Sequence, residues 1–140
     1  MPSTRRVFLS YSAADRELAK DLARLMTQRG LSVISVFNLE PGTEWPEVLR
    51  VELEKASALV LLIPSNDVPN RNYVWFEVGA ARALGKRILA VLPPTHRSVD
   101  LPTDIADVLV LDADKRPLES IADTLIQAVP ETDSADVSAN

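Results

Sequence analysis

Leu59-Val60-Leu61-Leu62-Ile63 is the stretch that decides the fold. Its residues are all apolar and do not alternate with polar ones, which is typical of a parallel strand covered by helices on both faces. A strand with one face in water would alternate apolar and polar residues along its length. Residues 59–63 therefore predict the centre of an α/β fold with helices in two layers.

Apolar runs and the helical patterns between them extend this prediction in both directions. The predicted strands are residues 7–12, 31–36, 59–63, 88–92 and 108–111. Amphipathic helices lie between and after them and end near Gly30, Gly85 and Pro130, and Asp15 is expected to cap the first helix. This alternation predicts right-handed crossovers and a parallel sheet. Because the first and third runs are the most apolar, we expect a flavodoxin-like three-layer sandwich with the strand order 2-1-3-4-5.

Length and charge limit the domain organisation and the partners. The chain has 140 residues and a formal net charge of −5. We expect one domain at residues 7–129, an N-terminal extension at 1–6 and a flexible tail or linker at 130–140. The acidic balance argues against nucleic acid or an anionic membrane as a partner, because both require clustered Lys and Arg.

Composition also excludes several kinds of chemistry. The sequence has no cysteine, which excludes disulfides, thiolate catalysis and Cys-based zinc sites. His96 is the single histidine, so motifs built on histidine pairs are excluded and we expect no metal site. No apolar run approaches the roughly 20 residues of a membrane span. We therefore expect a cytoplasmic protein.

Glu77 lies in the middle of a helical segment whose apolar face should turn toward the protein. At about 100° per residue, that face carries Tyr73, Val74, Glu77, Ala80, Ala81 and Leu84. Glu is rarely buried without a partner, so Glu77 serves the helix dipole, reaches the surface at the edge of the apolar face, or belongs to a site. The expected strand order places this helix beside the crevice at the carboxyl ends of strands one and three, where ligands bind in such sheets. That position favours a functional role.

Segments in this order resemble the TIR (Toll/interleukin-1 receptor) domain family, and specifically its bacterial NAD-cleaving members. The segments are Phe8-Leu9-Ser10-Tyr11-Ser12 with Asp15, Leu39 with Pro41-Gly42 and Trp45, Leu61-Leu62-Ile63-Pro64-Ser65, and Tyr73-Val74 followed by Glu77. The resemblance covers residues 7 to about 129. Three departures from the family pattern are Ser35 for an acidic residue, Tyr73 for a tryptophan, and Ser12-Ala13 for the arginines of some animal relatives.

The resemblance implies an NAD glycohydrolase or ADP-ribosyl cyclase that serves in bacterial immune signalling or defence and is activated by self-assembly. Glu77 would be the catalytic residue, with NAD as substrate and no separate cofactor. The residues implied to bind NAD are Ser10, Tyr11, Ser12, Phe37, Leu39, Trp45, Ser65 and Tyr73. One carboxylate suits the chemistry, because nicotinamide leaves readily and a fixed negative charge stabilises the oxocarbenium-like ribose. The implied partners are NAD and other TIR domains, including copies of this chain.

Two other functions stay open. Many TIR domains act by binding one another, which would make this chain a non-catalytic interaction module. A nucleoside deoxyribosyltransferase-like enzyme has a Glu-x-Gly-x-Ala segment on a similar fold, which resembles Glu77-Val78-Gly79-Ala80-Ala81. The small residues after Glu77 are expected to make room for a ligand, which favours an enzyme. The sequence leaves open whether NAD would yield linear ADP-ribose, a cyclic isomer or a base-exchange adduct.

Overall fold

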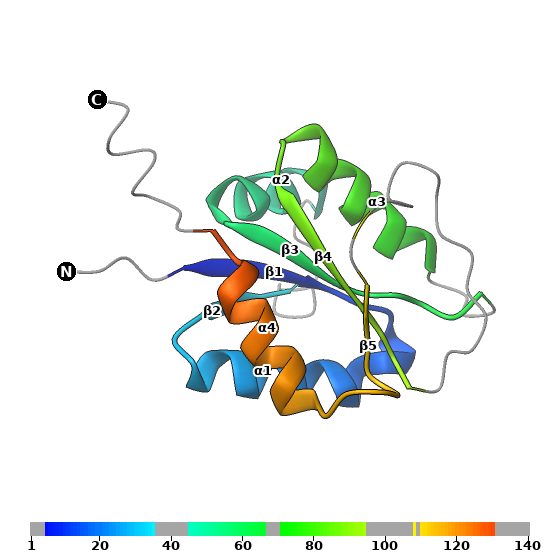
Figure 1. The fold of residues 1–140 in the computed structure, drawn as a ribbon. Helices are drawn as coiled ribbons and strands as arrows, with labels where there is room; N and C mark the ends of the chain where they lie inside the picture. Colours follow the sequence, from blue (N-terminus) through cyan, green and yellow to red (C-terminus); the bar gives the residue numbers. More distant parts are fainter. Residues whose placement is uncertain (1–4, 36–44, 67–70, 95–107, 109, 131–140) are drawn as a thin grey trace.

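The sheet at the centre of the fold has five parallel strands in the order β2-β1-β3-β4-β5 (Figure 1). It is taken from a computed structural model that describes residues 5–35, 45–66, 71–94, 108 and 110–130. The strands are β1 (Arg6–Ser10), β2 (Ser32–Ile34), β3 (Ala58–Leu62), β4 (Arg87–Leu92) and β5 (Val110–Asp112). The predicted fold class and strand order are confirmed.

β1 and β3 form the buried interior of the sheet, as their apolar sequences predict. All of β3 is buried, and so is β1 from Val7 to Ser10. β2 and β5 are the edge strands, and both are shorter than the predicted runs 31–36 and 108–111. An edge strand has a hydrogen-bonded neighbour on one side only, and short edge strands are a common result.

Helices cover both faces of the sheet. In the described residues they are α1 (Arg16–Gln28), α2 (Trp45–Lys55), α3 (Arg71–Ala83) and α4 (Leu118–Ala128). α1 and α4 lie against one face, and α2 and α3 lie against the other (Figure 1). The side chains of β1 alternate between these layers: Val7 and Leu9 pack on the α1 side, and Phe8 packs on the α3 side. By the same alternation Ser10 faces α3.

Two glycines end helices as the sequence predicts. Gly30 and Gly85 have φ angles of 97° and 73°, in the left-handed region that glycine adopts without steric cost. Gly30 follows α1, and Gly85 follows α3 and precedes β4. No helix among the described residues combines the length and the apolar character that a membrane crossing requires.

The expected capping role of Asp15 is wrong. Asp15 occupies the N-cap position of α1, but its side chain makes no capping hydrogen bond. The residues Ala13–Asp15 form a 3₁₀ turn instead. The Asp15 carboxyl group is buried there, and the hydroxyl of Ser12 donates to it at 3.5 Å.

Arg5 ties the start of the chain to its last helix. Its guanidinium donates hydrogen bonds to the carbonyl oxygens of Ile126 at 2.8 Å and Val129 at 3.0 Å. These contacts satisfy acceptors that a helix leaves unpaired at its carboxyl end. β1 begins at Arg6, so residues 5 and 6 of the predicted extension pack against the domain.

Candidate functional site

The inward face of α3 carries Glu77. Its buried residues are Val74, Glu77, Val78 and Ala81, which follow the spacing of one helical stripe. The stripe differs from the predicted one in two ways, because Val78 belongs to it and Leu84 is 37% exposed. Leu84 directly follows the last residue of α3, Ala83, and its N–H still donates to the carbonyl oxygen of Ala80 at 3.1 Å. The prediction that Glu77 faces inward is confirmed, with 2% of the residue exposed.

The carboxyl group of Glu77 meets a hydroxyl from the centre of the sheet. Ser10 Oγ donates a hydrogen bond to Glu77 Oε1 at 2.5 Å, and Ser10 itself is only 1% exposed. Ser10 is the last residue of β1, so this contact lies at the carboxyl edge of the sheet. The adjacent strand β3 lies on one side of β1 and β2 lies on the other. This is where the strand order reverses and where ligands bind in such sheets.

Burial dominates the electrostatics of Glu77. Removal from water disfavours the charged carboxylate and raises its pKa from 4.5 to about 7, while the hydrogen bond from Ser10 lowers the pKa and opposes part of that rise. Protonated and ionised forms therefore both exist near neutral pH. The ionised form can stabilise a neighbouring positive charge, and the protonated form can donate a proton.

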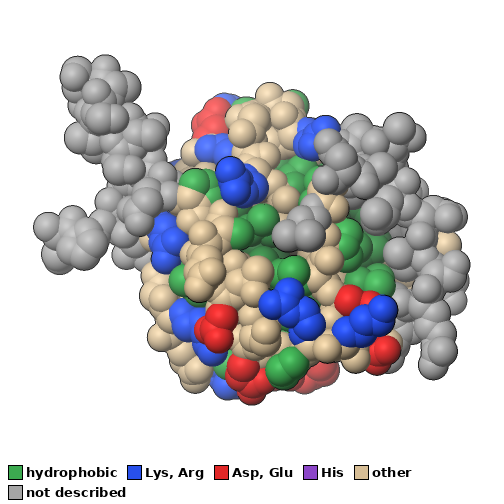
Figure 2. All heavy atoms as spheres, in the orientation of Figure 1, with side chains coloured by type: hydrophobic (Ala, Val, Ile, Leu, Met, Phe, Trp, Pro, Cys, Tyr) green, Lys and Arg blue, Asp and Glu red, His purple; other side chains and the backbone are tan. Residues whose placement is uncertain are grey.

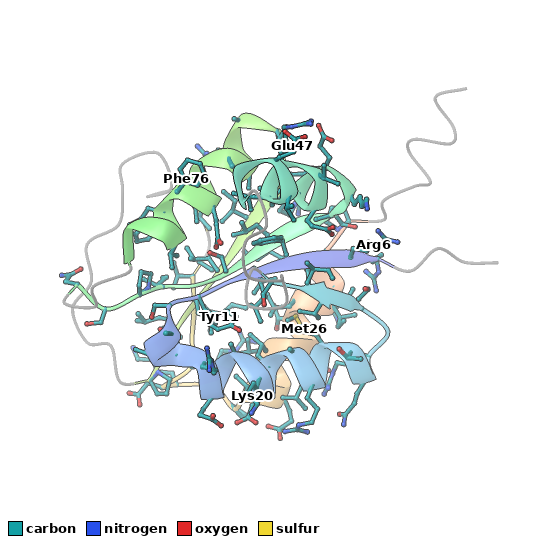
Figure 3. The ribbon with its side chains drawn as sticks, turned by 180° about the vertical axis from the view of Figure 1, so that it is seen from behind. Arg6, Tyr11, Lys20, Met26, Glu47 and Phe76 are labelled. Carbon is teal, nitrogen blue, oxygen red and sulfur yellow. The ribbon has the colours of Figure 1, made fainter. Side chains whose placement is uncertain are left out.

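Two other predicted residues of the β1 segment lie apart from this contact. Ser12 is buried and donates its hydrogen bond to Asp15. Tyr11 packs against the core on the α1 side of the sheet, whereas Glu77 belongs to the α3 side. Figure 3 shows Tyr11 between β1 and α1, on the opposite side of β1 from Phe76 of α3. The structure thus brings Ser10 to Glu77 but does not bring Tyr11 to it.

The remaining predicted residues are only partly covered by the structure. Ser65 follows β3 and is half-buried. Trp45 is the first residue of α2 and Tyr73 lies in α3, but their side chains are not among those described. Phe37 and Leu39 lie outside the described residues. Their roles in binding NAD stay predictions.

A separate pocket of about 200 Å³ lies between α1 and the strands β1 and β2. Its lining residues are Leu9, Tyr11, Ala19, Lys20, Ala23, Thr27, Val33 and Ser35. The sequence analysis missed Lys20 and the other α1 residues of this pocket. The signal was present, because Ala19 and Ala23 place two small side chains four positions apart on one helix face.

Charged side chains on the face in Figure 2 are mixed, with Lys and Arg interspersed among Asp and Glu. Among the described residues, several charged side chains form ion pairs: Arg29 Nε lies 2.6 Å from Asp123 Oδ1, and Arg50 contacts Glu47 at 2.5 Å and Glu54 at 2.8 Å. A nucleic-acid-binding face would gather unpaired basic side chains instead. Within the described part of the chain, no three His, Asp or Glu side chains are grouped so that they could hold a metal ion.

A comparison with protein-family models identifies the family. The model of the TIR domain matches residues 7–127. The chain belongs to the TIR-domain family. The matched residues include both members of the Ser10–Glu77 contact, so this contact lies inside the TIR domain itself.

Solved structures similar to this TIR domain include a receptor domain and an enzyme. The TIR domain of the Toll-related receptor TRR-2 from Hydra magnipapillata has a TM-score of 0.70 and 19% identity, covering 88% of this chain and 96% of that one. The CMP N-glycosidase BcmB of Clostridium botulinum has a TM-score of 0.59 and 18% identity, covering 84% and 98%. The TIR domain heterodimer of RPS4 and RRS1 gives a TM-score of 0.60 and 14% identity, covering 89% and 98%. At sequence identities this low, the similarity shows a shared fold and not a shared function. A search of curated proteins gave no match.

Gly79, Ala80 and Ala81 are the small residues after Glu77. In this TIR domain Gly79 is exposed, and a Cβ atom added to it would meet no atom within 4 Å. Ala80 is half-buried and Ala81 is fully buried in the core of the α3 side. Gly79 lies two positions after Glu77, so its Cα points about 200° away from Glu77 around the helix. The expectation that the small residues make room for a ligand stays a prediction.

Proposed function

We propose that this TIR domain cleaves the bond between ribose and nicotinamide in NAD, with Glu77 as the catalytic carboxylate. The observation that carries the proposal is the buried Glu77 side chain, which accepts a hydrogen bond from Ser10 at the carboxyl edge of β1. A carboxyl group removed from water has a stronger electrostatic effect on a nearby charge than an exposed one. Sites of this kind also concentrate perturbed pKa values, as found for Glu77.

The reaction requires a negative charge more than it requires an acid. The C1′–N bond breaks, its electron pair leaves with neutral nicotinamide, and positive charge develops on the ribose. Ionised Glu77 would stabilise that cation, and water would then attack C1′ and release a proton to give ADP-ribose. An internal nucleophile would give a cyclic isomer instead, and an external base would give an exchange adduct.

The proposal includes the wider setting that the family resemblance implies. NAD would be the substrate, other TIR domains would be the protein partners, and the activity would serve bacterial defence signalling in the cytoplasm after self-assembly. One solved structure of similar fold supports N-glycosidic chemistry in particular, because BcmB is a CMP N-glycosidase. The same likeness favours a second candidate substrate class, a nucleotide or nucleoside in place of NAD, as in the deoxyribosyltransferase-like alternative.

A non-catalytic interaction module is the other candidate. Its support is the similarity to the RPS4 and RRS1 TIR domains, whose structure is a heterodimer. In that case Glu77 would be a structural residue whose carboxyl group is satisfied by Ser10. The two readings differ in what they predict for turnover.

The deciding experiment incubates the purified protein with NAD, CMP and deoxynucleosides in parallel, free and clustered on a scaffold, and identifies products by mass spectrometry. We expect loss of NAD with release of nicotinamide. Glu77→Gln removes the charge and should lower the rate by about 10² to 10³-fold. Glu119→Gln is the matched control, since Glu119 is exposed in the first turn of α4 on the other face of the sheet. Turnover of CMP or deoxynucleosides alone would select the second candidate, and no turnover in any arm would select the interaction module.

A further inference from the structure

Ser10 and Glu77 are 67 residues apart in the sequence and meet inside the fold. Ser10 belongs to β1, which pairs with β2 and β3 and sets Ser10 opposite Leu61. Its backbone is therefore held in an interior strand of the sheet. Glu77 has a long side chain with several rotatable bonds, so its carboxyl group needs an external contact to hold one orientation.

The contact with Glu77 leaves the Ser10 hydroxyl no proton to donate to a substrate. A serine hydroxyl has one proton to donate, and Ser10 donates it to Glu77 Oε1 at 2.5 Å. Only 1% of Ser10 is exposed, so in this structure its hydroxyl faces Glu77 and not solvent. We propose that Ser10 is a positioning residue, which holds the Glu77 carboxyl group in place, and that it does not contact NAD. This assignment replaces the binding role that the family resemblance implies for Ser10.

The same contact affects the charge of Glu77. Burial raises the pKa of Glu77, and the hydrogen bond from Ser10 acts in the opposite direction because it stabilises the ionised form. Ser10 thus increases the fraction of Glu77 that is ionised near neutral pH. The catalytic role of the Ser10–Glu77 contact rests on the proposed NAD cleavage. The contact and its effect on the ionisation of Glu77 can be measured without any substrate.

The first measurement is a carbon-13 NMR titration of the side-chain carboxyl groups in protein labelled at glutamate. The Glu77 signal is assigned by its absence in Glu77→Gln. We expect Glu77 to titrate near pH 7 in the parent, at higher pH in Ser10→Ala and Ser10→Cys, and near the parent value in Ser10→Thr, which keeps the hydroxyl. Ser10→Cys covers the case in which Ser10→Ala does not fold.

Ser57→Ala is the matched control for loss of a buried hydroxyl. Ser57 is 7% exposed and lies just before β3, at the opposite end of the sheet from the Ser10–Glu77 contact. Its Oγ has no hydrogen-bond partner among the residues that the structure describes. This substitution should leave the titration of Glu77 unchanged. A Glu77 titration that is unmoved in both Ser10→Ala and Ser10→Cys would overturn the proposal.

The second measurement is the pH dependence of NAD cleavage. If Ser10 positions Glu77, Ser10→Ala should shift the rise of kcat/KM to higher pH, costing about tenfold at pH 6 and little at pH 9, with KM near the parent value. A direct substrate contact would instead raise KM at every pH without moving the profile, and that result would overturn the proposal. Should the parent cleave no NAD while the NMR titration responds to Ser10→Ala, the positioning contact stands and the proposed function fails.

Discussion

Glu77 links the stability of the protein to pH, because its pKa is about 7 in the fold and 4.5 as the reference for an unperturbed Glu. Between these values the folded state holds a proton that the unfolded state has released. Stability from this group is therefore fully present below about pH 4.5 and is lost as pH rises through 7, by an amount on the order of 3 kcal/mol. The Gln side chain of Glu77→Gln does not titrate, so the free energy of unfolding of this variant does not fall with pH for this reason. We expect urea unfolding to show it more stable than the parent at pH 8, with little difference at pH 5.

Glu119→Gln is the control for that comparison, because Glu119 is exposed and its replacement should change stability equally at both pH values. A constant difference between Glu77→Gln and the parent from pH 5 to pH 8 would show that Glu77 is not perturbed in the fold. The prediction concerns stability only, so it holds whether or not the protein has NAD as a substrate.

Single residues were predicted from the sequence where a local period determines their direction. The inward direction of Glu77 follows from its place in a helical stripe, and it is confirmed. Its partner Ser10 could not be deduced in the same way, because their contact depends on how β1 and α3 pack across 67 residues of sequence. The family resemblance suggests a shared site for Ser10, Tyr11 and Glu77, but Tyr11 follows the end of β1 and packs on the α1 side.

At the scale of elements, the sequence is most informative where burial is complete. β3 is buried throughout, and its unbroken apolar sequence predicted a central parallel strand. The edge strands β2 and β5 have half-buried residues, and there the apolar pattern continues beyond the hydrogen-bonded ladder. The end of α3 was predicted by Gly85, but the exposure of Leu84 was not, because a helical period gives the direction of a side chain and not what covers it at the end of the helix.

Two glycines of α3 and its C-terminal turn provide a test of these backbone arguments. Gly79 lies inside the helix in open space, so Gly79→Ala should raise the free energy of unfolding by up to about 1 kcal/mol. Gly85 has a φ of 73°, so Gly85→Ala places a Cβ in the left-handed region and should lower stability by about 1 kcal/mol. Urea denaturation of the two variants measures both effects. Equal effects of the two substitutions would contradict the assigned end of α3.

At the scale of the whole molecule, the burial of Glu77 raises the question of how a substrate reaches it. With 2% of Glu77 exposed, the ribose of NAD could approach its carboxyl group only if neighbouring segments move. Such movement costs free energy, and contacts with a second copy of the domain can offset that cost. The proposed function includes association with other TIR domains, among them copies of this chain. We therefore expect that association and activity are coupled.

The rate of NAD cleavage per molecule should consequently rise with protein concentration. The rise should level off once the protein is associated, because further addition no longer changes the fraction that can admit substrate. Turnover is measured across a wide concentration range alongside sedimentation velocity. The protein concentration at which the rate is half-maximal should coincide with the concentration at which half of the protein is associated. Clustering the domain on a scaffold should give the high rate at a low bulk concentration, and Glu77→Gln on the same scaffold should stay inactive. A rate per molecule that stays constant while sedimentation shows association would mean that the monomer already admits substrate to Glu77.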